Sequence, residues 1–84
     1  VIMEIKELIK FVKQYRKLID RASYVSIDCY NSVLPSTPIA PVGHWDGEDK
    51  ADAILDVLTD CAREDAFRLK RDGVTVLYFI HFDL

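Results

Sequence analysis

The chain has 84 residues, of which 50% are hydrophobic and 30% are charged, with a formal net charge of −3. This length has room for one domain, so we expect residues 1–84 to form a single α+β domain with a small core. The composition is typical of a globular protein and excludes a disordered chain. No apolar run approaches the roughly 20 residues of a membrane-spanning helix, and the N-terminus lacks a signal-peptide pattern. We therefore predict no membrane partner and a cytoplasmic location.

A long helix is predicted from residue 2 to about residue 22, where no Gly or Pro interrupts a helical apolar repeat. The repeat consists of Ile5, Leu8, Ile9, Val12, Tyr15, Leu18, Ile19 and Ala22. These side chains cover an arc of roughly 200°, which is wider than one core requires. The excess favours self-association, and the alternative is the interior helix of a tightly packed monomer.

A half-buried strand is predicted next, because the apolar period changes to two at Ser23. Pro35, Pro38 and Pro41 then recur at every third residue, which is the repeat of a polyproline II helix. We therefore expect residues 34–46 to form a stiff connection.

A second helix is predicted to begin at Asp46, whose carboxylate suits an N-cap ahead of an acidic first turn. Gly73 supplies a left-handed stop after a basic last turn. Residues 74–84 then alternate in the manner of a strand that is covered on both sides.

The expected order is α-β-α-β, with two long helices packed on a small sheet that dimerisation extends or covers. If the two strands are neighbours, the intervening helix predicts that they run parallel. A two-stranded sheet is seldom stable alone, so a homodimer is the preferred assembly.

The polar side of the first strand is the main candidate site, because Tyr24, Asp28 and Tyr30 combine a carboxylate with two phenols on a rigid element. We expect His81 of the last strand to share this face and to approach Asp28. The alternative is an ordinary solvated or helix-covered sheet face.

A second candidate site is the loop that carries His44 and Trp45 ahead of the second helix. In the alternative interpretation, Trp45 anchors the loop on the core while Asp46 caps the helix. Asp65 lies close to the apolar stripe of the second helix, and we expect it at the edge of that stripe, paired with a neighbouring arginine.

Neither a metal nor a cofactor is predicted, because the Cys and His residues lack local ligand spacing and no glycine-rich phosphate loop is present. A stripe of Lys6, Lys10, Lys13, Lys17 and Arg21 is interpreted as a solvated helix face, so nucleic acid is not an expected partner. The preferred function is a non-enzymatic binding module for a small molecule or a protein. The alternative is a small enzyme that uses Asp28, His81 or His44 as acid or base.

Overall fold

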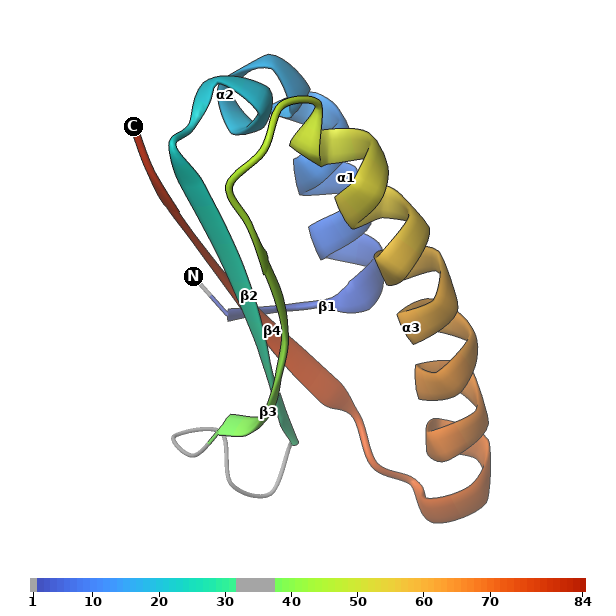
Figure 1. Cartoon of the computed structure of the whole chain (residues 1–84). Coiled ribbons are helices and arrows are strands. Elements are labelled where there is room, and N and C mark those ends of the chain that lie inside the picture. Colours follow the sequence, from blue (N-terminus) through green and yellow to red (C-terminus); the bar gives the residue numbers. More distant parts are fainter. Residues whose placement is uncertain (1, 32–37) are drawn as a thin grey trace.

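A computed structural model describes residues 2–31 and 38–84 of the chain (Figure 1). The elements in chain order are β1 (Ile2–Glu4), α1 (Ile5–Gln14), α2 (Arg16–Arg21), β2 (Tyr24–Asn31), β3 (Pro38–Trp45), α3 (Lys50–Asp72) and β4 (Val76–Asp83). The α+β class and the order of the predicted helices and strands are confirmed, and β1 and β3 are additional strands. Within the described residues, no helix is both long and apolar enough to span a membrane.

The four strands form one sheet in the order β1-β4-β2-β3, and every neighbouring pair is antiparallel. The expectation that the two predicted strands run parallel is therefore wrong for β2 and β4. The reason is β3, which reverses the chain beside β2 before α3 begins. As a result α3 connects β3 to β4, and these two strands run parallel to each other on either side of β2.

The strand β3 occupies most of the segment that was expected to be a stiff connection. Pro35 lies outside the described residues, whereas Pro38 and Pro41 belong to β3. Proline is tolerated at the edge of a sheet, because its missing N–H group can face away from the neighbouring strand. The pairing of β3 with β2 is irregular on either side of Asp28 and Cys29.

The first predicted helix is shorter than expected at its N-terminal end and is interrupted in the middle. Residues 2–4 form a strand, with Met3 opposite Tyr78, so pairing with β4 overrides the helical pattern there. Tyr15, with φ −104° and ψ 28°, separates α1 from α2.

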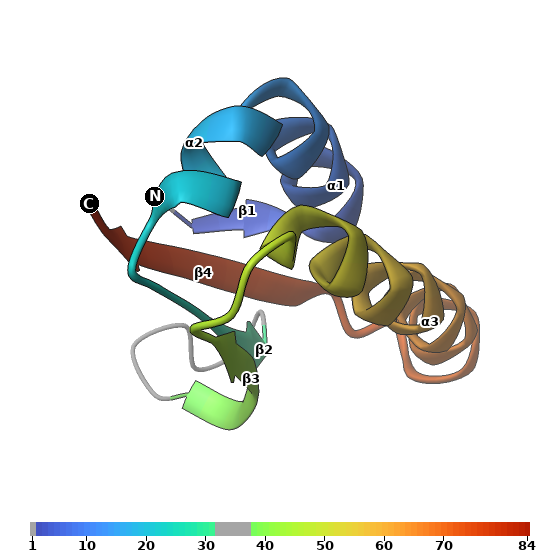
Figure 2. The same ribbon diagram turned by 45° about the horizontal axis from the view of Figure 1, so that its top comes forward.

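The core lies between the three helices and one face of the sheet (Figure 2). Leu8, Val12 and Ile19 of the first helical segment are completely buried. They belong to the same buried cluster as Ile27 of β2 and Ile54 of α3. This part of the wide apolar arc is thus used within the chain, and it leaves no surface at Leu8 or Ile19 for a partner, whereas Tyr15 of the same arc is 41% exposed. The homodimer remains a prediction.

The start of α3 differs from the predicted cap at Asp46, which is exposed and precedes the helix. The helix begins at Lys50, and the Ala51 N–H group donates a hydrogen bond of 2.8 Å to Oδ1 of Asp20. The Lys50 ammonium, which is only 3% exposed, donates to the carbonyl oxygens of Gly47 (2.6 Å) and Asp20 (3.1 Å). The cap of α3 therefore comes from the end of α2.

The predicted stop of this helix is confirmed at Gly73, which has φ 69° and donates its N–H group to the Leu69 carbonyl oxygen at 2.9 Å.

Candidate functional site: the open face of the sheet

All three helices lie on one side of the sheet, and the other side, here called the open face, carries the candidate residues (Figure 2). Successive side chains of a strand alternate between faces, and residues opposite each other on neighbouring strands share a face. The strand pairings therefore place the following residues on the open face: Ile2, Glu4, Tyr24, Ser26, Asp28, Tyr30, His44, Leu77, Phe79, His81 and Asp83.

The shared face of Tyr24, Asp28, Tyr30 and His81 follows directly from the pairing of β2 with β4. Their exact neighbours differ from the prediction, because the strands are antiparallel. Asp28 lies opposite Phe79, and His81 lies opposite Ser26. The expected approach of Asp28 to His81 is replaced by a contact within β4, where Nε2 of His81 lies 3.1 Å from Oδ1 of Asp83.

His44 joins this face from the edge strand β3, opposite Ser26. Its imidazole stacks on the phenol of Tyr24, with ring centroids 5.9 Å apart and an interplanar angle of 22°. Because residues 38–45 form a strand rather than a loop, His44 and its neighbour Trp45 point to opposite sides of the sheet.

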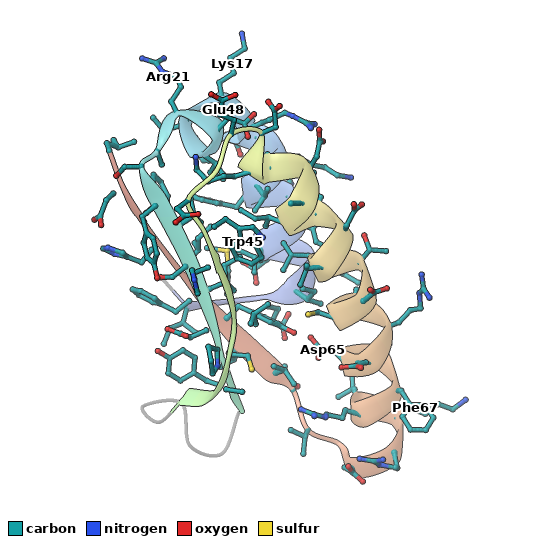
Figure 3. All side chains as sticks on the ribbon, in the orientation of Figure 1. Lys17, Arg21, Trp45, Glu48, Asp65 and Phe67 are labelled. Atoms are coloured by element: carbon teal, nitrogen blue, oxygen red, sulfur yellow. The ribbon has the colours of Figure 1, made fainter. Side chains whose placement is uncertain are left out.

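Trp45 is therefore separated from the other candidate residues. Its half-buried indole packs against the core between β3 and α3 (Figure 3). The ring lies over Gly43, where an added Cβ would be 3.1 Å from Cη2 of Trp45. The interpretation of Trp45 as an anchor is confirmed. Because a side chain at position 43 would press against the indole, this contact explains the glycine there.

The chemical character of the open face comes from aromatic rings and carboxylates. Tyr24, Tyr30, His44 and Phe79 supply the rings. Glu4, Asp28 and Asp83 supply the carboxylates, and no Lys or Arg lies on this face in the described strands. Rings and carboxylates together attract a cation that carries apolar surface.

The sequence interpretation did not include Leu77 and Phe79 in the site, although they share the alternation of His81. Both are half-buried and lie opposite Tyr30 and Asp28. Their apolar character suggested a covered face, whereas the helices cover only the other face.

A second cluster lies on the helix side of the sheet, where the Tyr78 hydroxyl donates a hydrogen bond to Oδ2 of Asp65. Asp65 was expected to pair with an arginine, but its hydrogen bond comes from Tyr78, because the side chain turns toward β4 (Figure 3). Arg68 acts on it only as a nearby charge that lowers its pKa. Burial raises the pKa of Asp65, and the hydrogen bond from Tyr78 opposes this shift. Burial and the adjacent carboxylate also raise the pKa of Tyr78.

Asp65 also borders a cavity of about 290 Å³ between α3 and the start of β4. Ile5, Ala66, Leu69 and Val76 give this cavity apolar walls. Nearby, burial raises the pKa of Cys61, which keeps its thiol protonated and weakly reactive.

Among the residues that the structure describes, no group of three or more His, Cys, Asp or Glu side chains is arranged to hold a metal ion. Both cysteines are free thiols, and the Cys29 thiol donates to the carbonyl oxygen of Ala40 at 3.2 Å.

Comparisons with protein-family models, curated proteins and solved structures give no match to this chain.

Proposed function

We propose that the chain is a non-enzymatic binding module whose open face engages a protein partner through an aromatic group beside a cationic one. The observation that carries this proposal is the composition of the open face, where rings and carboxylates occur together without Lys or Arg in the described strands. A partner that presents a basic side chain next to an aromatic one complements both features.

The arrangement of the face favours a protein partner over a small molecule. The half-buried side chains Tyr24, Asp28 and Tyr30 lie along β2, and Phe79 lies beside Asp28 on β4. These side chains run along β2 and onto its neighbour β4, about 4.8 Å away, and can therefore contact an extended surface. Aromatic side chains of this kind are enriched at protein interfaces.

The exposure of the His81 and Asp83 pair weighs against the enzymatic alternative. Their side chains are 56% and 62% exposed. Acid–base catalysis benefits from a water-excluded cleft that shifts pKa values and strengthens electrostatic interactions. Asp65, whose pKa burial does raise, lies on the opposite side of the sheet from the candidate residues.

A titration with three indole probes tests the proposal, because their ring is constant and their charge is not. Tryptamine is cationic, indole is neutral and indole-3-acetate is anionic at neutral pH. In ¹H–¹⁵N NMR spectra, we expect each probe to shift the amide signals of β2 and β4. Tryptamine should bind most tightly and saturate these shifts at the lowest concentration, and indole-3-acetate should bind most weakly. Asp28→Asn should weaken tryptamine binding several-fold, whereas Asp56→Asn, on the exposed side of α3, should not.

Shifts confined to α3 and its cavity would contradict the proposal. Equal binding of the cationic and anionic probes would contradict it as well, because the carboxylates would then have no part in recognition.

A further inference from the structure

The cavity between α3 and the start of β4 lies beyond the end of the closely packed core. The last buried residue of α3 is Leu58, although the helix continues to Asp72. Its apolar stripe also continues, through Ala62, Ala66 and Leu69, but Leu69 is 54% exposed. Figure 1 shows the reason, because α1 lies beside only the N-terminal half of α3. The C-terminal half therefore faces β4 across the cavity of about 290 Å³.

The cavity has the composition of a small-molecule site, which combines apolar walls with a few polar groups. Ile5 of α1, Leu69 of α3 and Val76 of β4 line it with aliphatic side chains from three elements. Its volume is about ten times the ~30 Å³ that a water molecule occupies in the liquid. A ligand of up to about ten non-hydrogen atoms would therefore fit.

The carboxylate of Asp65 supplies a fixed polar group in this cavity. Figure 3 shows Asp65 turned toward β4, whereas Phe67 points away from the sheet. Oδ2 of Asp65 accepts a hydrogen bond from the hydroxyl of Tyr78. An ionised carboxylate has about four acceptor sites on its two oxygens, so this bond leaves capacity for a donor from a ligand. Because Tyr78 holds the carboxylate in place, the acceptor is oriented before a ligand arrives.

The charge of this carboxylate is incompletely compensated in the free protein. Burial disfavours the ionised form and raises the pKa of Asp65, and Glu64 adds a second negative charge nearby. Arg68 opposes this shift only as a nearby charge. The other charged residues of the lining, Glu4 and Lys6, are exposed and opposite in sign, so they largely offset each other. A cation inside the cavity would therefore complement Asp65.

We propose that this cavity is a binding site for a small primary amine with an apolar body. The ammonium group of the ligand donates to the Asp65 carboxylate, and the apolar body lies between Ala66 of α3 and Val76 of β4. The charge-assisted hydrogen bond selects an amine over an alcohol of the same length, and the apolar body gains from leaving water. The site lies on the helix side of the sheet, so it does not depend on the function proposed for the open face.

Three straight-chain probes test the proposal, because they share an alkyl chain and differ in charge. Hexylamine is cationic, hexanol is neutral and hexanoate is anionic at neutral pH. In ¹H–¹⁵N NMR titrations of the 84-residue chain, we expect hexylamine to shift the amide signals of residues 62–69 and 74–76. Hexylamine should bind about tenfold more tightly than hexanol, and hexanoate should bind most weakly.

Asp65→Asn removes the charge of the site but keeps a side-chain oxygen that can accept from Tyr78. We expect this variant to bind hexylamine about tenfold more weakly and hexanol nearly as well as the wild type does. The matched control is Asp56→Asn, on the exposed side of α3, which should change neither affinity.

Ala66→Leu tests the cavity itself, because the larger side chain occupies part of the space and should weaken the binding of hexylamine and hexanol alike. Ala53→Leu makes the same change at an exposed position of α3 that does not line the cavity, and it should leave both affinities unchanged.

The proposal would be overturned if hexylamine shifted none of these signals or bound no more tightly than hexanoate. Unchanged hexylamine binding in Asp65→Asn, or equal effects of Ala66→Leu and Ala53→Leu, would overturn it too, because each result places the amine outside the contact with Asp65. Hexylamine shifts confined to β2 would also overturn it, since they would assign the amine to the open face, and they would leave the function proposed for that face intact.

Discussion

The hydroxyl of Tyr78, in the first half of β4, donates a hydrogen bond to the carboxylate of Asp65 on α3. Tyr78 is 2% exposed, and the Asp65 carboxylate satisfies its buried hydroxyl, with the thiol of Cys61 as a second neighbour of the same hydroxyl. The bond connects the C-terminal half of α3, where Phe67 and Leu69 are exposed, to the core of the sheet. Removing this hydrogen bond therefore tests whether it holds the C-terminal half of α3 against the sheet.

We predict that Asp65 makes the stability of the chain depend on pH. Burial raises its pKa above the usual 3.8, so the folded protein holds this proton more tightly than the unfolded chain does. The contribution of Asp65 to the free energy of unfolding is then fully present below pH 3.8 and is lost as the pH rises through the folded pKa. In Asp65→Asn, this fall in the free energy of unfolding with rising pH should be absent. Urea unfolding at a series of pH values from below 3.8 upward measures it.

The control for this experiment is Asp72→Asn, because Arg71 lowers the pKa of Asp72. For Asp72 the sign is reversed, and the stability of the variant relative to the wild type should fall, not rise, with increasing pH. A pH-independent difference between Asp65→Asn and the wild type would contradict the prediction.

The energy of the contact between Tyr78 and Asp65 can be measured by a double-mutant cycle. Asp65→Ala removes the carboxylate that accepts from the buried hydroxyl and should lower the free energy of unfolding by about 1–3 kcal/mol. In the Tyr78→Phe background, the same change should cost at least about 0.5 kcal/mol less. Additive effects of the two substitutions would show that the hydrogen bond does not stabilise the fold.

Asp20→Ala should destabilise the protein by about 1 kcal/mol, because it removes the acceptor of the Ala51 N–H group at the start of α3. Asp46→Ala is the matched control. Asp46 is exposed and precedes the helix, so its loss should change the free energy of unfolding by less than about 0.5 kcal/mol. Chemical denaturation of both variants shows whether Asp20 of α2 or the nearby Asp46 caps α3. A larger loss of stability for Asp46→Ala than for Asp20→Ala would contradict the prediction.

Gly43→Val should displace the indole of Trp45, because even a Cβ at position 43 lies 3.1 Å from Cη2 of the ring. The chain has one Trp, so its fluorescence reports on this ring alone. We expect a red shift of the emission as the ring becomes more exposed, and a loss of about 1–3 kcal/mol of stability. Gly47→Val is the control, since no atom lies within 4 Å of an added Cβ there. An unchanged emission spectrum for Gly43→Val would show that the ring does not rest on Gly43.

Much of the candidate site could be predicted from the period of β2, which assigns Tyr24, Asp28 and Tyr30 to one face. The period could not reveal the direction of the neighbouring strand, and that direction decides that Asp28 faces Phe79 rather than His81. It also could not show that the prolines before His44 belong to an edge strand. Proline spacing describes local backbone preference, whereas an edge position is a property of the whole sheet.

The sequence by itself determined features that depend on residues close together in the chain. The stop at Gly73 and the buried stripe of Leu8, Val12 and Ile19 are such features, because backbone preference and helical period act within a few turns. Only the tertiary structure decided that residues 2–4 form a strand and that Asp20 caps α3. These outcomes depend on β4 and α3, which lie far along the chain from the residues they contact, so no local pattern encodes them.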